Sequence, residues 1–480
     1  MMISLNDILV MLPELYLAAA ACALLLIDAF MRDDQRDVVH WVSIVVLVVG
    51  IYLVWSGQPP ITMTAFDGMF VRDRMAEILK VFALGATAIV FVLSRPYLRD
   101  RKLLIGEFYV LGLFAVLGLM LLISAGNLVS LYLGLELYSL SAYALIALNR
   151  DSRLSSEAAI KYFVLSALAS GLLLYGMSMI YGATGTLGLD AIHRAATMTT
   201  HPGLLRFGLV FLVVGIGFKF GAAPFHMWIP DVYEGAPTPV VAFISSAPKL
   251  AAFGMAWRLL ESGMGSWVAD WRLMLAALAV LSMAIGNVAA IAQTNLKRML
   301  GYSTISHMGF LLLGLAGGSP GGYTAALYYA VCYALMSTAA FGIILLLARA
   351  GFECEMIDDL KGLNRRSPWF AGMMAIAMFS LAGVPPLFGF FAKVMVLKSA
   401  IDANMLWLAI VAIAFSIIGI FYYLRVVKVM YFDAPQEGAP PLQPVPDVSL
   451  RVVLSANALA LLALGLVSGP LLTWCQRAFG

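Results

Sequence analysis

Two interrupted apolar segments decide the fold of this 480-residue chain: residues 217–230, GFKFGAAPFHMWIP, and residues 379–393, FSLAGVPPLFGFFAK. Each is broken by proline, at Pro224 and at Pro385-Pro386. Proline removes an amide donor from a helix, and in lipid the freed backbone groups are tolerated only where protein or water satisfies them. Single prolines also kink membrane helices without any function, but that alternative does not explain two breaks at matching positions. Paired breaks of this kind indicate a transport site.

The composition around these segments excludes a water-soluble protein. Only 12% of the residues are charged and 62% are hydrophobic, and the mean hydropathy is +0.93. Because an ordinary soluble domain has about twice this charged fraction, the expected solvent is lipid. A net charge of +3 without a basic tract argues against a nucleic-acid partner. The four cysteines are scattered and the usual cofactor motifs are missing, so we expect no iron-sulfur cluster, zinc, nucleotide or flavin in this chain.

Apolar runs long enough to cross a bilayer recur along the whole sequence. We therefore predict an all-α polytopic membrane protein with about fourteen transmembrane helices. The first run contains Glu14 and Asp28 and lacks a basic leader with a cleavage site, so we interpret it as a retained helix. The Pro-rich segment from Phe432 to Asp447, which includes Pro440 and Pro441, is interpreted as a connector. The predicted helices cover residues 8–30, 39–56, 74–94, 105–123, 126–148, 158–182, 205–222, 238–262, 271–292, 299–317, 322–349, 369–398, 404–430 and 449–471.

The distribution of basic residues orients the helices in the membrane. If the N-terminus lies on one side, the loops on the opposite side collect seventeen lysines and arginines, against eight on its own side. The positive-inside rule places the richer side in the cytoplasm, with both termini on the periplasmic side of a bacterial inner membrane. Five lysines fall inside the apolar runs instead: Lys80, Lys161, Lys219, Lys249 and Lys393.

The helix count also predicts a repeat. Helices 4 to 8 and 9 to 13 form two blocks of five, and because five is odd, the second block enters the membrane in the opposite sense. The broken segments are the fourth members of these blocks, helices 7 and 12, which indicates an inverted repeat. We predict four regions: residues 1–104 with helices 1 to 3, residues 105–262 and 263–430 as the two repeats, and residues 431–480 with the last helix.

Four ionisable residues lie deep in the predicted helices. Charge at the bilayer centre costs at least a few kcal/mol, so such groups indicate a polar interior pathway. Glu136 lies near the middle of helix 5, Lys219 just before the first break, Lys249 after a proline in helix 8, and Lys393 after the second break. The alternatives are structural: Glu136 bonds a neighbour, Lys249 bonds carbonyls freed by its kink, and Lys393 extends to the outer interface.

Other polar residues allow more than one interpretation. His307 in helix 10 is either a relay or a satisfied buried histidine, and His226 either lines the broken helix or marks its aqueous end. Lys161 and Lys80 lie near helix ends, where extension of the side chain to the interface is a strong alternative. The remaining charges are explained by a cytoplasmic loop or by the positive-inside rule, namely Asp231, Glu234, Lys297 and Arg298.

Protons are the ion that this set of residues favours. Desolvation favours the neutral form of a lysine, whereas a nearby carboxylate stabilises the ammonium. A Glu136–Lys219 pair whose spacing changes would therefore load and release a proton. The sequence shows no cage of carboxylates for a sodium or calcium ion. Moving a proton against 100 mV needs about 2.3 kcal/mol, and since no part of this sequence supplies that energy, the driving reaction must occur elsewhere.

Five stretches carry a specific resemblance to a known family. They are LYLGLELYSLSAYALIAL, EAAIKYFVLSALASGLLLYGMSMIYG, GFKFGAAPFHMWIPDVYEGAPTPVVAFISSAPK, QTNLKRMLGYSTISHMGF and FSLAGVPPLFGFFAK. The chain resembles subunit N of the bacterial proton-pumping NADH-quinone oxidoreductase, respiratory complex I, which corresponds to mitochondrial subunit 2. This family belongs to the antiporter-like subunits related to Mrp antiporters. The paired LGLELYS and YEGAPTPV sequences favour subunit N over subunit M.

The resemblance implies a proton channel built from two half-channels. Glu136 and Lys219 match the family's charged pair of the cytoplasm-facing half, Lys249 the connecting lysine, His307 a relay, and Lys393 the lysine of the exit half. The resemblance also implies that flavin, iron-sulfur clusters and quinone belong to partner subunits, and that subunits M and K are neighbours in the membrane arm. The alternative function is a subunit of an Mrp-type cation/proton antiporter or of a related membrane-bound redox complex, and a further alternative is a scaffold whose buried lysines only hold partners.

Overall fold

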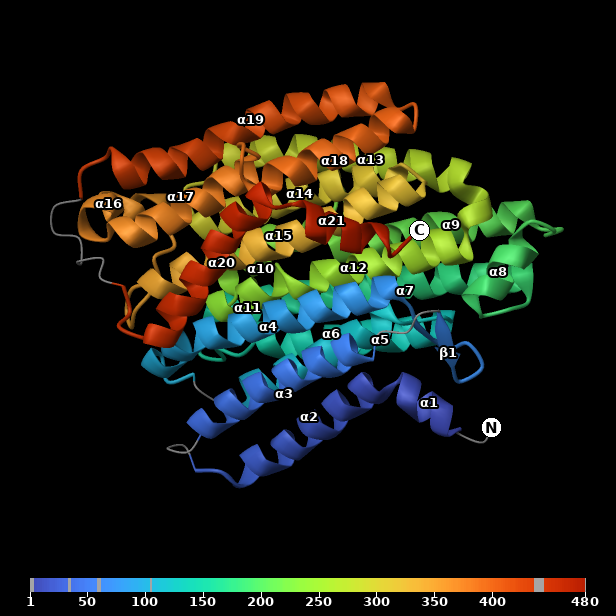
Figure 1. Cartoon of the computed structure of the whole chain (residues 1–480), viewed down its shortest axis with the longest axis horizontal. Coiled ribbons are helices and arrows are strands. Elements are labelled where there is room, and N and C mark those ends of the chain that lie inside the picture. Colours follow the sequence, from blue (N-terminus) through green and yellow to red (C-terminus); the bar gives the residue numbers. More distant parts are fainter. Residues whose placement is uncertain (1–3, 33–35, 58–61, 104–105, 436–443, 480) are drawn as a thin grey trace.

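The computed structural model describes residues 4–32, 36–57, 62–103, 106–435 and 444–479. Long helices lie side by side in one elongated bundle (Figure 1). In these ranges, 13 helical segments are long and apolar enough to cross a membrane. One further crossing is made by α17 (Pro368–Ala382) and α18 (Phe388–Asp402), which are each too short to count alone. The prediction of an all-α membrane protein with about fourteen spans is confirmed.

The chain runs through an N-terminal group, two blocks and a final helix pair. The N-terminal group contains α1 (Leu5–Val10), α2 (Leu12–Phe30), α3 (Asp37–Ser56), strands β1 (Met63–Ala65) and β2 (Phe70–Arg72), and α4 (Arg74–Asp100). The first block contains α5 (Gly106–Ile123), α6 (Leu128–Ile146), α7 (Arg153–Thr184), α8 (Leu189–Ala196), α9 (Pro202–Phe220), α10 (Trp228–Gly235), α11 (Thr238–Ile244), α12 (Ala247–Trp257), the π-helix η2 (Arg258–Gly263) and η3 (Gly265–Trp267). The second block contains α13 (Val268–Ile291), α14 (Leu296–Ala316), α15 (Pro320–Leu347), η4 (Ile357–Leu360), α16 (Leu363–Arg366), α17, α18 and α19 (Leu406–Tyr431), and the chain ends with α20 (Val448–Leu466) and α21 (Gly469–Gln476).

Several helices begin after a residue whose side chain accepts a hydrogen bond from a backbone amide of the first turn. These amides have no acceptor within the helix itself. The capping side chains belong to Asn127 at α6, Ser152 at α7 and Asn295 at α14, and each accepts a hydrogen bond from a first-turn amide. Because Ser152 caps α7, this helix begins at Arg153, five residues before the predicted start. The prediction of one final helix over 449–471 was wrong at its end, because Gly469-Pro470 begins the separate α21.

The antiparallel pair β1–β2 was not predicted. It pairs Met63 with Arg72, and its turn contains Asp67 and Gly68, both with positive φ. The strands are three residues long, so they leave the period-two signal too short to distinguish from a loop.

Three segments form the centre of the bundle. In Thr238–Gly263, α14 and α15, 94% of the most apolar window is buried, compared with 33% in α2, α19 and α20. The outer helices accordingly present large apolar side chains outward, as expected of a surface in lipid. Figure 1 shows α19 and α2 at opposite edges of the bundle.

Both predicted breaks are confirmed. The first broken helix passes from α9 to α10 and the second from α17 to α18. The first half of each ends at a glycine in the left-handed region, Gly221 with φ 71° and Gly383 with φ 84°. The peptides Ala223-Pro224 and Pro385-Pro386 are cis.

The two blocks contain corresponding contacts. The first and second helices of each block pack together, α5 with α6 and α13 with α14. The first helix of each also packs on the last, α5 on α12 and α13 on α19. The inverted relation between the blocks and the four region boundaries remain predictions. The boundary at residues 104–105, as well as Pro440 and Pro441, lies outside the described residues.

Close packing of α5 and α6 leads to a stability prediction. A Cβ at Gly134 would lie 2.6 Å from the backbone nitrogen of Leu122, whereas a Cβ at Gly171 in α7 would meet no atom within 4 Å. Gly134→Ala should therefore lower the free energy of unfolding by about 1–3 kcal/mol through overpacking. Gly171→Ala should be neutral or stabilising, because alanine is the better helix former. Denaturant unfolding of both variants in detergent checks this, and equal destabilisation would contradict it.

Candidate functional site

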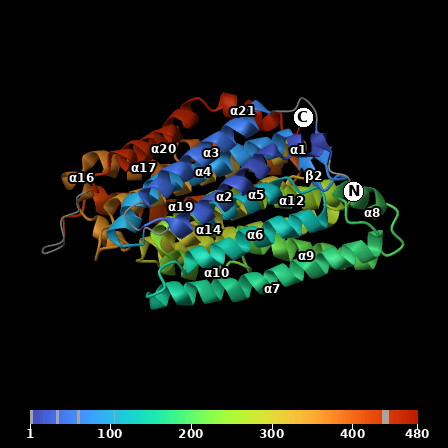
Figure 2. The same cartoon turned by 90° about the horizontal axis from the view of Figure 1, so that it is seen from below.

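Lys219 lies in the last turn of α9 and is buried. Its ammonium donates hydrogen bonds to the hydroxyl oxygens of Ser139 on α6, at 2.9 Å, and Ser166 on α7, at 3.2 Å. Figure 2 shows α6, α7 and α9 along the same edge of the bundle. Lys219 is therefore held by neutral hydroxyl groups from two neighbouring helices.

Glu136 is brought to the same groove, but not into direct contact with Lys219. Its carboxylate accepts a hydrogen bond from the Ser170 hydroxyl. Ser139 follows Glu136 by one turn on α6, and Ser166 precedes Ser170 by one turn on α7. Among the ion pairs of the described residues, none joins Glu136 to Lys219, although the two groups interact electrostatically through space. The serines thus lie between the acid and the base.

Lys249 on α12 lies next to the first break. Its ammonium donates to the carbonyl oxygen of Phe220 at 2.9 Å and approaches that of Lys219 at 3.5 Å. It also lies 5.0 Å from the centre of the Trp228 ring. As the structural alternative expected, Lys249 bonds free carbonyls, but these belong to the end of α9 and not to its own helix. Lys219 and Lys249 line one small cavity together with Tyr138, Tyr162 and Trp228.

Lys393 plays the corresponding part at the second break. Its ammonium donates to the carbonyl oxygen of Ala382, the last residue of α17, at 2.8 Å, and to the hydroxyl oxygen of Ser416 on α19 at 3.0 Å. The residue is only 8% exposed and points back into the bundle. The alternative that Lys393 extends to the outer interface is therefore wrong, because the free carbonyl of the break holds its ammonium inside.

His307 on α14 lies between two tyrosines. Its Nδ1 is 2.7 Å from the Tyr329 hydroxyl and its Nε2 is 3.0 Å from the Tyr423 hydroxyl. The Tyr423 hydroxyl is also 2.5 Å from Ser303 Oγ. A neutral imidazole has one donor and one acceptor nitrogen, so both tyrosines can be bound at once. His307 also interacts electrostatically with Lys393, and the row Ser303–Tyr423–His307–Tyr329 is a continuous chain of hydrogen bonds.

Two other candidates lie apart from this group. His226 is half-buried between α9 and α10, and its Nδ1 has no hydrogen-bond partner among the described residues. The Lys161 side chain is 44% exposed and forms ion pairs with Glu157 at 2.9 Å and Asp231 at 2.8 Å. The alternative of an outward-facing Lys161 therefore matches the structure better than a place in the buried relay.

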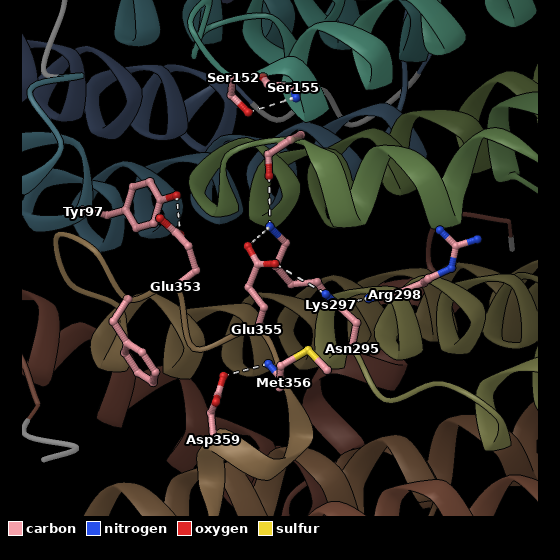
Figure 3. Close-up of polar contacts among 12 residues, drawn as sticks. Tyr97, Ser152, Ser155, Asn295, Lys297, Arg298, Glu353, Glu355, Met356 and Asp359 are labelled. Carbon is pink, nitrogen blue, oxygen red and sulfur yellow. Dashed lines mark hydrogen bonds and ion pairs between the residues drawn. The ribbon is translucent and has the colours of Figure 1, made fainter. Parts of the chain in front are cut away.

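The interpretation of Lys297 by the positive-inside rule was incomplete. Lys297 is 2% exposed, and its ammonium contacts Glu355 at 3.2 Å and the carbonyl oxygen of Ala236 at 3.1 Å. Figure 3 shows Lys297 pointing toward Glu355 and Arg298 directed elsewhere. The loop after α15 covers the start of α14, where the Leu296 amide donates to the Glu355 carbonyl oxygen. Arg298 instead binds Asp231 and Glu234, at 2.9 and 2.7 Å.

The interface alternative for Lys80 was also wrong. Its ammonium lies 2.5 Å from the carboxylate of Glu14, and both side chains are buried. The partner comes from α2, some 66 positions earlier in the chain, so periodicity within one helix could not identify it.

The sequence interpretation missed the hydroxyl partners of these charges. Ser139 could have been found, because it follows Glu136 at helical spacing, and so could Ser166 and Ser170, which are four residues apart in a largely apolar stretch. Tyr329 and Tyr423 reach His307 from α15 and α19, and no local pattern indicates their meeting. Within the described ranges, no group of three or more His, Cys, Asp or Glu side chains gathers as a metal site.

Comparison with known proteins identifies the family of this chain. The family described as "NADH:quinone oxidoreductase/Mrp antiporter, TM" matches residues 125–419. NADH-quinone oxidoreductase subunit N of Thiobacillus denitrificans is 52% identical, covering 98% of this chain and 97% of the relative, and that of Xanthomonas euvesicatoria is 54% identical, covering 98% and 96%.

Comparison with solved structures supports the same family. A chain of respiratory complex I from Thermus thermophilus superposes with a TM-score of 0.84 at 33% identity, covering 97% of this chain and 100% of that one. A chain of the Mrp complex from Dietzia superposes equally well, at 0.84, but at 22% identity, covering 99% and 97%, and so shows the fold alone. The chain therefore belongs to the subunit N family of NADH-quinone oxidoreductase, the antiporter-like membrane-arm subunits of respiratory complex I.

Proposed function

We propose that this chain translocates protons through a relay of Glu136, Lys219, Lys249, His307 and Lys393. The observation that supports the proposal is the environment of Lys219, a buried ammonium held by two serine hydroxyls with a carboxylate one helical turn away. A hydroxyl can accept a hydrogen bond from an ammonium or donate one to a neutral amine. Lys219 can therefore give up its proton without leaving an unsatisfied neighbour.

The proposed order of the relay runs from the input half to the exit half. A proton enters near Glu136 and reaches Lys219, whose neighbour Lys249 shares the same cavity. Movement of Glu136 away from Lys219 removes the charge that stabilises the ammonium, and the proton passes on. His307, bound to tyrosine hydroxyls through both ring nitrogens, carries the charge toward Lys393 and the exit half. Residues 105–262 form the cytoplasm-facing half-channel and residues 263–430 the outward-facing half.

The orientation, partners and class of reaction belong to the same proposal. The asymmetry of the loop arginines and lysines supports a cytoplasmic end at α16 and periplasmic termini, and Figure 1 shows α1 toward the end opposite α16. The chain acts as a proton translocase subunit, with subunits M and K as neighbours. Flavin, iron-sulfur and quinone chemistry takes place in partner subunits, and this chain contributes no redox centre.

Removing the two groups of the input half tests the relay. Lys219→Ala or Glu136→Ala should lower proton pumping and coupled quinone reduction in membranes at least about tenfold, because loss of a proton-transferring group typically costs this much or more. Lys398→Ala is the matched control, since Lys398 is an exposed lysine on the helix that carries Lys393.

The scaffold alternative makes a different prediction. It expects that the Lys219 variant fails to assemble, which native gel electrophoresis would reveal. Pumping at the wild-type rate by assembled complexes of both variants contradicts the relay.

The hydroxyl chain at His307 gives a second prediction. Tyr423→Phe removes the group that links Ser303 to His307, and pumping should fall several-fold while the helices remain packed, because only one oxygen is lost. Tyr431→Phe, eight residues and about 12 Å further along α19, should leave the rate unchanged. Equal rates in wild type and Tyr423→Phe would remove this tyrosine from the relay.

Co-purification distinguishes the proposed complex from an antiporter. In mild detergent the chain should purify with proteins that contain flavin and iron-sulfur clusters, which optical and paramagnetic spectra detect. Sodium-dependent proton exchange by a preparation without these centres would favour the Mrp-type alternative.

A further inference from the structure

The short helix α10 contains none of the relay residues, yet it is packed closely on two sides. It lies between α7 and α14. Its Gly235 faces α7, where a Cβ would lie 2.8 Å from the carbonyl oxygen of Leu154. Gly301 of α14 faces α10 from the other side, where a Cβ would lie 3.4 Å from side-chain atoms of Ile229 and Tyr233. The position of α10 therefore depends on both neighbouring helices.

One end of α10 forms a wall of the cavity shared by Lys219 and Lys249. Trp228, the first residue of α10, lines this cavity and is buried. Its indole nitrogen donates to the carbonyl oxygen of Phe218 at 3.1 Å, and the Lys249 ammonium lies 5.0 Å from the centre of the ring. A cation over the face of an indole ring is attracted to its π-electrons. The position of Trp228 therefore affects the stability of the Lys249 ammonium.

The other end of α10 is bound by the first turn of α14. Lys297 donates to the carbonyl oxygen of Ala236, the C-cap of α10, at 3.1 Å. The next residue, Arg298, contacts the carboxylates of Asp231 at 2.9 Å and Glu234 at 2.7 Å. The C-terminal end of a helix carries partial negative charge, so a cation is favourable at this place. Two consecutive residues of α14 thus bind three groups of α10.

Lys297 contributes more to this attachment than Arg298. The Arg298 side chain is 28% exposed and its partners are also partly exposed, so water screens these ion pairs and each contributes little. Lys297 is buried, and a hydrogen bond from a charged donor is stronger than one between neutral groups. Loss of the ammonium would also leave the carbonyl oxygen of Ala236, a buried residue, without this donor.

A loop of the second block directs the Lys297 side chain. Residues 348–356 connect α15 to η4, and Glu355 in this loop contacts the Lys297 ammonium at 3.2 Å (Figure 3). The Glu355 carboxylate also accepts from the Asn295 side chain at 3.4 Å, next to the start of α14. With Glu355 on one side, the ammonium has the Ala236 carbonyl oxygen as its other partner.

The helix that binds the end of α10 also carries His307. Lys297 and His307 are ten residues apart on α14, about 15 Å along one helix axis. From Ala236 back to Trp228, α10 spans about 12 Å. A shift of α14 therefore moves His307 and the attached end of α10 together, and α10 transmits this movement to the wall of the cavity at Lys249.

We propose that Lys297 is a positioning residue that couples the two half-channels through α10. Its ammonium holds the end of α10 against α14, and this keeps Trp228 over Lys249. When α14 moves together with His307, the contact between the indole and the Lys249 ammonium changes. The effect on pumping rests on the proposed function, whereas the attachment of α10 to Lys297 is tested without it.

Hydrogen–deuterium exchange of the purified, assembled complex tests the attachment. Lys297→Met removes the ammonium and keeps most of the side-chain volume. The amides of residues 232–236 should exchange at least about tenfold faster, because local opening of α10 no longer breaks a hydrogen bond to a charged group. Lys428→Met should leave this exchange unchanged, since Lys428 is exposed on α19 and contacts Asp433. Unchanged exchange in Lys297→Met would overturn the proposal.

Proton pumping tests the consequence for the relay. Lys297→Met should pump several-fold more slowly, and Lys297→Arg should recover most of the rate, because a guanidinium can donate to both Ala236 and Glu355. Pumping at the wild-type rate by a Lys297→Met complex with fast exchange in α10 would overturn the coupling. If Lys219→Ala also pumps at the wild-type rate, the relay itself fails, and the exchange result still decides whether Lys297 holds α10.

A double-mutant cycle distinguishes action through Trp228 from a general structural effect. If Lys297 acts through the indole, Lys297→Met should add little to the loss of pumping caused by Trp228→Phe alone, because the two residues then belong to one unit. Losses that multiply as for two independent sites would contradict the coupling.

A second variant covers the case in which Lys297→Met fails to assemble. Lys297→Met with Glu355→Gln leaves no carboxylate without its cation, and it should assemble and show the same fast exchange in α10. Slow exchange in this double variant, or its failure to assemble, would overturn the proposal.

Discussion

The bundle depends on one constraint: within lipid, every backbone polar group must find its partner inside the protein. Two breaks in the middle of spanning helices violate this rule locally, because the last carbonyls of a helix have no intrahelical donors. At both breaks, a buried lysine donates a hydrogen bond to one of these free carbonyls. Lys249 donates to the Phe220 carbonyl oxygen at the end of α9, and Lys393 donates to the Ala382 carbonyl oxygen at the end of α17. Trp228 adds a third donor, to the carbonyl of Phe218.

The positions of these two ammonium groups are energetically favourable for a second reason. The C-terminal end of a helix carries partial negative charge, which stabilises a cation placed against it. A buried ammonium that would be costly in an apolar core thus gains both hydrogen bonds and a favourable field at each break. Structure and function share the same side chains here, so broken helices and buried lysines occur together rather than by coincidence.

The sequence was sufficient for the features that depend on one helix at a time. Span number, both breaks and the buried positions of Lys219, Lys249 and Lys393 follow from hydropathy, proline and the cost of charge in lipid, whereas Glu136 is only partly buried. The sequence did not reveal which side chains of different helices contact one another. Lys80 was judged by its distance from a helix end, whereas its partner is on α2.

Lys297 shows the same limitation. It was assigned to the cytoplasmic surface, whereas a loop from beyond α15 buries it against Glu355. The meeting of His307 with tyrosines of α15 and α19 depends likewise on packing across the bundle. Such contacts are set by tertiary structure, which local periodicity does not encode.

The serines between Glu136 and Lys219 have a consequence for how easily the input half can change state. Breaking a buried ion pair costs roughly 3–5 kcal/mol, whereas a hydrogen bond to a charged group contributes about 1.5–3 kcal/mol. Because Ser139, Ser166 and Ser170 hold the two charges separately, α6 can shift against α9 by exchanging one such bond. That cost is of the same size as the roughly 2.3 kcal/mol needed to move one proton against 100 mV, so the rearrangement of the input half and the transport of one proton need comparable free energies.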